Sequence, residues 1–147
     1  MKSPASTVIS MRLPQKSGQR LKRLAASHGW TPSDASARLV EEGLRRTDFA
    51  FIDFRDSASG RQAFLQGSSL AVWEVVLLVR HYEKDAARVA KHLRWPVAKV
   101  HAALNYAKAF PEEIERALAE QDEAGITSLS RLLPQLRVFA AGKPSGK

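Results

Sequence analysis

Residues 6–14 read STVISMRLP, and residues 15–46 continue as QKSGQRLKRLAASHGWTPSDASARLVEEGLRR. Apolar and other residues alternate in the first stretch, so one face carries Ile9, Met11 and Leu13, and the opposite face carries Val8, Ser10 and Arg12. Alternation with a period of two is typical of a β-strand with one buried face. The stretch therefore predicts a single strand that ends at Pro14.

Two helices are expected after this strand. Apolar spacing predicts the first helix from Gln15 to His28, with Gly29 in the left-handed position that ends many helices. Thr31 has the side chain of an N-cap, and Pro32 suits the first helical position. The second helix is therefore predicted from Pro32 to about Arg46.

A lone strand followed by two short helices cannot be stable by itself. Such a module buries little apolar surface, and its strand has two unpaired edges. A second copy of the chain can supply an antiparallel strand, so that the apolar faces of both strands cover the helices. The opposite face of this two-stranded ribbon is narrow enough to enter a DNA major groove, and it carries Val8, Ser10 and Arg12 from each chain.

Residues ~7–46 resemble the ribbon-helix-helix repressors of the Arc/MetJ type, on the run VISMRLP and the two helices that follow it. The resemblance implies a dimeric DNA-binding domain over residues 1–47. It assigns base reading to Val8, Ser10 and Arg12. The N-terminus of the second helix, with Thr31 and Ser33, is then expected to hold a phosphate. Lys16 and Arg20 of the first helix are expected to add phosphate contacts.

Residues 48–123 are predicted to form a second domain with a core of its own. Turn-rich residues 56–60 lie between two strand-like runs and indicate a β-hairpin. The run 70–82 is apolar on nearly every side and indicates a buried helix. Further helices are expected over 85–93, 96–110 and, rich in acidic residues, from Pro111. The fold class expected for the whole chain is thus mainly α with short β.

The short connection Arg94-Trp95 makes the pair of helices at 85–110 similar to a helix-turn-helix. Lys99, His101 and Lys108 lie on the second helix of the pair. A helix with these residues is consistent with a second DNA reader, and equally with a protein-binding scaffold that has a basic rim. The residues alone leave both interpretations open.

Residues ~50–118 resemble a domain of bacterial antitoxins of the VapB kind. The resemblance rests on a Gly-Arg strand, a Val-Trp-Glu-Val helix, the helix-turn-helix-like pair, and a Tyr followed by Pro-Glu-Glu-Ile. It favours the protein-binding interpretation, because such domains are commonly paired with a PIN-like ribonuclease toxin. The resemblance assigns no catalytic residue.

In the tail at 124–147, leucines recur at helical spacing before a final stretch of Ala, Gly, Lys, Pro and Ser that is expected to be disordered. The amphipathic part either packs on its own domain or binds in a hydrophobic groove of the toxin. In the second case arginines would reach the acidic metal site of the nuclease. The toxin-binding residues would then be Leu129, Arg131, Leu132, Leu133, Leu136 and Arg137.

Composition narrows the remaining possibilities. The chain has 147 residues, a net charge of +8, no cysteine, and no apolar run long enough to cross a bilayer. The four histidines show no metal-ligand spacing, so no catalytic residue, metal or cofactor is expected. A cytoplasmic location without membrane association is the default.

Together these observations predict a type II antitoxin rather than an enzyme. The chain is expected to form a homodimer or a larger assembly, to repress its own operon by binding operator DNA, and to neutralise a PIN-like ribonuclease. The alternative is a free-standing dimeric transcriptional repressor without a toxin partner.

Overall fold

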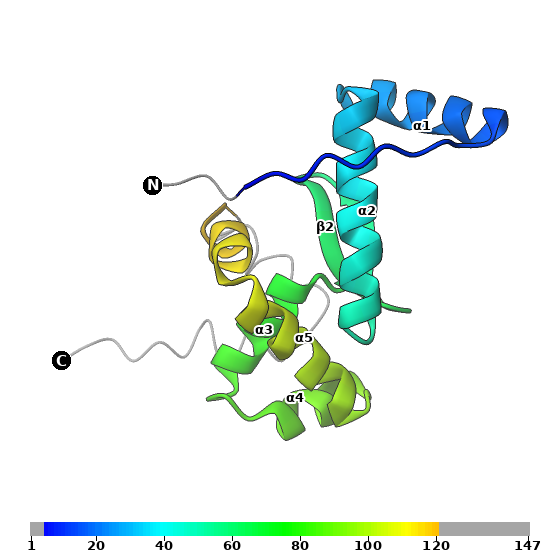
Figure 1. The fold of residues 1–147 in the computed structure, drawn as a ribbon. Coiled ribbons are helices and arrows are strands. Elements are labelled where there is room, and N and C mark those ends of the chain that lie inside the picture. Colours follow the sequence, from blue (N-terminus) through cyan, green and yellow to red (C-terminus); the bar gives the residue numbers. More distant parts are fainter. Residues whose placement is uncertain (1–4, 121–147) are drawn as a thin grey trace. The chain divides into compact units, whose positions relative to one another are not determined.

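The computed structural model describes residues 5–120 and is mainly helical, with one small antiparallel sheet (Figure 1). This confirms the expected class of mainly α structure with short β. The contacts divide the chain into Met1–Gly43, called unit 1 below, and Leu44–Lys147, called unit 2. The division falls inside a continuous helix, a few residues before the boundary expected after residue 47.

Both predicted helices of unit 1 are present. Helix α1 spans Gln15–His28 and ends at Gly29, whose φ of 68° is the left-handed conformation that favours glycine. Helix α2 spans Pro32–Asp48 and thus runs slightly beyond the expected end at Arg46. Its N-cap is Thr31, whose Oγ1 accepts a hydrogen bond from the Asp34 N–H at 3.1 Å.

The strand predicted at the start of the chain is not formed in this single chain. Residues 5–14 have no regular secondary structure. A β-strand exists only through hydrogen bonds to a neighbouring strand, and residues 15–43 contain no strand.

In unit 2 the predicted β-hairpin is confirmed. Strand β1 (Ile52–Ser57) pairs antiparallel with β2 (Gly60–Leu65), from Ile52 opposite Leu65 to Ser57 opposite Gly60. Gly60 closes the turn with a φ of 106°, which a residue with a Cβ rarely adopts. One face of the hairpin is buried in the core of unit 2, with Ile52, Phe54, Ala63 and Leu65.

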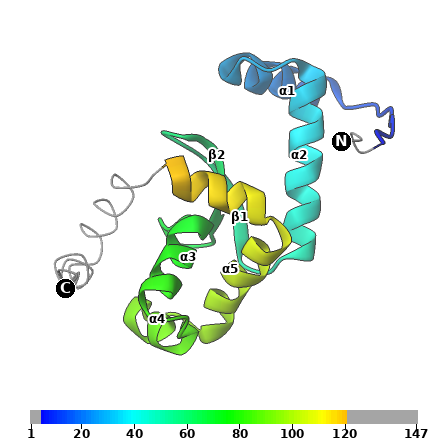
Figure 2. The same ribbon diagram turned by 90° about the vertical axis from the view of Figure 1, so that its left-hand side faces the viewer.

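Three helices complete the core of unit 2: α3 (Val72–His81), α4 (Ala86–Leu93) and α5 (Val97–Ala109). Helix α3 is buried almost all round, as expected. Residues 111–120 form the predicted acidic helix, which leaves α5 on the side away from α4 (Figure 2). Its Ile114 enters the same core as Val89 of α4 and Val100 of α5. No helix within residues 5–120 is long and apolar enough to span a membrane.

Tyr106 joins three elements of unit 2 through its hydroxyl group. The ring is fully buried, and Oη donates to Glu113 Oε2 at 2.6 Å. Arg45, near the end of α2, donates from Nη1 to Tyr106 Oη at 2.6 Å and to Glu113 Oε1 at 2.9 Å. Burial and the Glu113 carboxylate raise the pKa of Tyr106 well above its usual range, so the phenol stays protonated. The end of α2 is thereby fixed to α5 and to helix 111–120.

A second ion pair ties the end of α2 to the hairpin. Arg46 Nη2 lies 3.3 Å from Asp53 Oδ1, and Arg55 Nε lies 3.4 Å from Asp53 Oδ2. Partial burial alone would raise the pKa of Asp53, but the Phe54 N–H and the two guanidinium groups together lower it. The last residues of α2 are therefore part of unit 2, which explains why the division of the chain precedes them.

Candidate nucleic-acid interface

In residues 5–14 both faces of the predicted strand are exposed. Val8 is 91% exposed, on the face expected to read bases; Ile9 at 75%, Met11 at 53% and Leu13 at 44% belong to the face expected to be buried. Ser10 and Arg12 are exposed as well, and neither forms a hydrogen bond or ion pair with another residue of the range 5–120. The three residues predicted to read bases are thus accessible, and the apolar residues predicted to lie opposite them are exposed as well.

Unit 1 also lacks a core of its own. Its only buried apolar residues in the described range are Ala25 and Ala35, both with side chains of one carbon. Beside them lies an open groove of about 580 Å³, whose lining joins the predicted strand to both helices and comprises Leu13, Ser17, Arg20, Leu21, Arg23, Leu24, Ser27 and Leu39. A two-helix unit with an open leucine-lined groove has the surface that a second copy would have to cover.

The expected phosphate-binding residues are distributed over two places in unit 1. Arg20 lines the groove, whereas Lys16 is exposed outside its lining. Thr31 caps α2 with its side chain, and Ser33 is exposed in the first turn of the same helix. No hydrogen bond connects these residues to the reading residues Ser10 or Arg12 within the part of the chain that the structure describes.

Trp30 packs within unit 1, as expected for an aromatic residue at a helix junction. Its ring stacks on the His28 ring with centroids 4.3 Å apart. The Arg38 guanidinium lies over the same indole ring, 4.5 Å from its centroid. The indole is therefore held by its own chain.

In unit 2 a short connection joins α4 to α5. Arg94 ends α4 with a left-handed φ of 58°, and α5 begins at Val97 after Pro96. Residues on the outer side of α5 recur every three or four positions and are exposed: Ala98, His101, Asn105 and Lys108. Lys99 is placed differently from what the sequence suggested, because its ammonium lies over the Trp95 ring, 4.3 Å from the centroid. Partial burial there lowers the pKa of Lys99.

Within residues 5–120, no three His, Asp or Glu side chains lie close enough together to bind a metal ion. The residues predicted to bind the toxin all lie outside the residues that the structure describes. These are Leu129, Arg131, Leu132, Leu133, Leu136 and Arg137.

Sequence reasoning missed the cluster of Arg45, Tyr106 and Glu113. The three residues are far apart along the chain, with separations of 61 and 68 positions from Arg45. Only the position of Tyr106 on the apolar side of a predicted helix hinted at a buried phenol that would need a partner.

Comparison with known proteins adds no assignment: no family model, no curated protein and no solved structure matches the chain.

Proposed function

We propose that the chain is the antitoxin of a type II toxin–antitoxin system. It dimerises through residues 5–14, represses its own operon by binding operator DNA with the resulting ribbon, and neutralises a PIN-like ribonuclease toxin with residues 124–147. The observation that carries the DNA-binding part is the uncovered alternation in residues 5–14, with Arg12 on the face opposite Ile9 and Met11.

Pairing of residues 5–14 from two copies of the chain would explain why both faces of this segment are exposed in a single copy. The apolar face would cover the leucine-lined groove, removing exposed hydrophobic surface from water. The other face would then carry Val8, Ser10 and Arg12 twice, on a ribbon that fits a major groove. A free-standing dimeric repressor would use this ribbon in the same way. The two functions therefore differ only in whether the chain binds and neutralises a toxin.

The toxin part of the proposal is supported by the sequence of the tail and by the core of unit 2. Unit 2 has an apolar core around Tyr106, Val75 and Leu78 that does not draw on residues 5–14. In this proposal residues 5–14 serve DNA binding, and residues 124–147 serve the protein partner. Co-expression with the product of the neighbouring gene tests this part: a stable complex that suppresses ribonuclease toxicity is expected, and no complex would leave the free-standing repressor.

Arg12→Ala tests the ribbon directly. Arg12 is the only charged residue on the reading face, so its loss should lower operator affinity by about 1–3 kcal/mol, while weak binding to unrelated DNA changes little. The measurement is a gel shift at fixed salt with DNA from upstream of the gene. Arg38→Ala is a suitable control because Arg38 packs on Trp30. Equal operator binding by wild type and Arg12→Ala would remove the ribbon from base reading.

A further inference from the structure

We infer that the α4–α5 helix-turn-helix of unit 2 is a second contact with duplex DNA, in which the outer face of α5 lies in the major groove. This goes beyond the proposed function, which assigns DNA binding to residues 5–14 of unit 1 alone. The inference rests on the distribution of charge and pairing in unit 2 and on the exposed face of α5.

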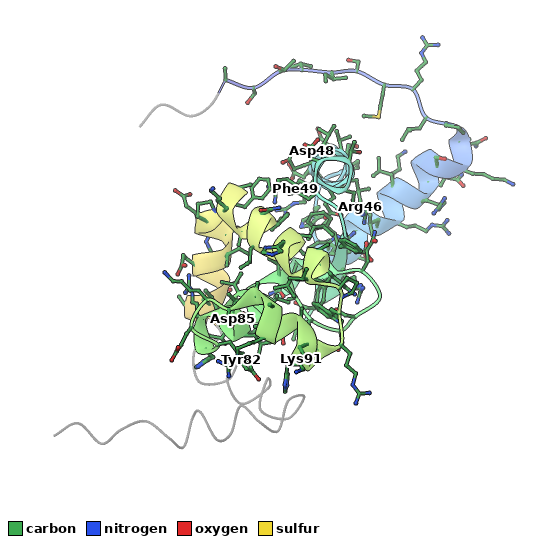
Figure 3. The ribbon with its side chains drawn as sticks, turned by 90° about the horizontal axis from the view of Figure 1, so that it is seen from below. Arg46, Asp48, Phe49, Tyr82, Asp85 and Lys91 are labelled. Atoms are coloured by element: carbon green, nitrogen blue, oxygen red, sulfur yellow. The ribbon has the colours of Figure 1, made fainter. Side chains whose placement is uncertain are left out.

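The segment that forms the helix-turn-helix contains no carboxylate. From Ala86 to Pro111 there is no Asp or Glu, and the run is bounded by Asp85 and Glu112. The same run contains five cationic residues, namely Arg88, Lys91, Arg94, Lys99 and Lys108. Figure 3 shows Lys91 on α4 together with Tyr82 and Asp85, at the end of unit 2 away from Arg46, Asp48 and Phe49.

These cations differ from most of the arginines elsewhere in the described part of unit 2. Arg45, Arg46 and Arg55 form salt bridges with acidic side chains, and so do Arg61 with Asp56 and Arg80 with Glu115. None of the five cations at 86–111 forms a salt bridge to a carboxylate of residues 5–120. Within residues 44–120, five of the six arginines outside the helix-turn-helix are thus paired with carboxylates, and Arg116 is the exception.

Two of the five cations are held in place by aromatic rings. The Arg88 guanidinium lies over the Tyr82 ring at 5.2 Å, and the Lys99 ammonium lies over the Trp95 ring at 4.3 Å. A ring orients a cation without cancelling its charge. Asp85, the carboxylate that precedes the run in the sequence, is the N-cap of α4, and its Oδ1 accepts a hydrogen bond from the Arg88 backbone N–H at 3.1 Å.

The exposed face of α5 suits a groove better than it suits a protein surface. Its first turn presents Val97, which is 44% exposed, and Ala98, whose short side chain lets the helix backbone approach closely. Further along the face lie Asn105, whose amide can pair with adenine, and Lys108, which can reach a phosphate. The face has no exposed aromatic or leucine residue of the kind that anchors protein interfaces. Duplex RNA is a poorer fit, because its major groove is too narrow for a helix.

Arg94 allows a test that separates binding from folding. Its left-handed backbone favours glycine, so Arg94→Gly removes a cation and relieves the constraint at the same site. The variant should therefore melt at a temperature no lower than wild type. Lys108→Ala, on the exposed face of α5, removes a second cation without touching the core.

The experiment measures the affinity of the full-length chain for a mixed-sequence DNA duplex at several salt concentrations. The double variant Arg94→Gly/Lys108→Ala should lower the slope of log K against log[salt] by about two units, one for each lost phosphate contact. Arg116→Ala is the control, because Arg116 is an exposed cation on helix 111–120, at the opposite end of unit 2 from α4 (Figure 1). The loss should be smaller on an RNA duplex of the same sequence.

A slope equal to that of Arg116→Ala would overturn the inference, and so would an equal loss on RNA. If the double variant keeps DNA binding but fails to neutralise the toxin, the face belongs to a protein partner. The double variant and Arg12→Ala are also measured on DNA from upstream of the gene, which separates this inference from the proposed function: loss with Arg12→Ala alone leaves operator binding to the ribbon, and loss with the double variant alone leaves it to α5.

Discussion

Glu74 is a carboxylate inside the apolar helix α3. It is 8% exposed, and its Oε1 accepts the Ala71 N–H at 3.0 Å. Ala71, the N-cap, has no side-chain acceptor, so Glu74 supplies only one half of a capping box. The carboxylate is thus retained for a backbone donor at the start of a helix that otherwise buries valine, leucine and tryptophan.

Burial raises the pKa of Glu74, so folding favours its protonated form. The stability gained from this shift is present below the unfolded pKa and is lost as pH rises through the folded pKa. Glu74→Gln keeps an oxygen for the Ala71 N–H and carries no charge. Its melting temperature should match wild type near pH 4 and exceed it near pH 7. Thermal melts between pH 4 and pH 7 measure this difference, with Glu112→Gln, at an exposed site, as the control. An equally lowered melting temperature of Glu74→Gln at both pH values would contradict the prediction.

At the scale of elements, residues 5–14 have the alternation of a strand, and the described residues of unit 1 offer it no partner strand. Ile9 and Met11 lie on one face and Val8 and Arg12 on the other. Ile9→Ser with Met11→Ser should abolish dimerisation, because each buried apolar side chain contributes about 1.5–3 kcal/mol and each occurs twice in the dimer. Val8→Ser with Arg12→Ser, on the opposite face, should leave the dimer intact.

Light scattering of the two double variants gives the oligomeric state. A dimer that survives the Ile9 and Met11 replacements would move the contact to another surface of unit 1, such as α2, where Val40 is exposed. Loss of the dimer in both variants would show that the segment pairs without the predicted alternation of faces.

For the whole molecule, the last turn of α2 decides how unit 2 can be isolated. A fragment from Phe49 to Lys147 keeps the hairpin and the helices but loses Arg45 and Arg46, which bind Tyr106, Glu113 and Asp53. A fragment from Thr31 keeps these contacts and the capped start of α2. Both should fold, and the longer one should be more stable by about 1.5–3 kcal/mol, the range for hydrogen bonds to charged groups.

Urea denaturation of the two fragments measures this difference. Arg45→Ala in the longer fragment should reproduce most of the loss, because Tyr106 and Glu113 then keep only their bond to each other. Equal stability of the two fragments would mean that the end of α2 contributes nothing to unit 2.

The sequence by itself determined the elements that local signals control. Gly29 ends α1, Thr31 caps α2, and Gly60 closes the hairpin, because each acts through its own backbone or a neighbour within a few residues. The run 70–82, which is apolar on nearly every side, likewise located the buried helix α3. These signals need no knowledge of distant parts of the chain.

Only the tertiary structure decided which charges are neutralised and where unit 2 begins. Arginines look alike in the sequence, yet Arg45 is paired with Glu113 whereas Arg94 has no carboxylate partner among residues 5–120. The strand predicted at 5–14 likewise has no regular secondary structure here, because alternation alone does not form a strand without a hydrogen-bonded neighbour. Ion pairs and strand pairing depend on distance in space between residues far apart in the chain, and that distance is set only when the core packs.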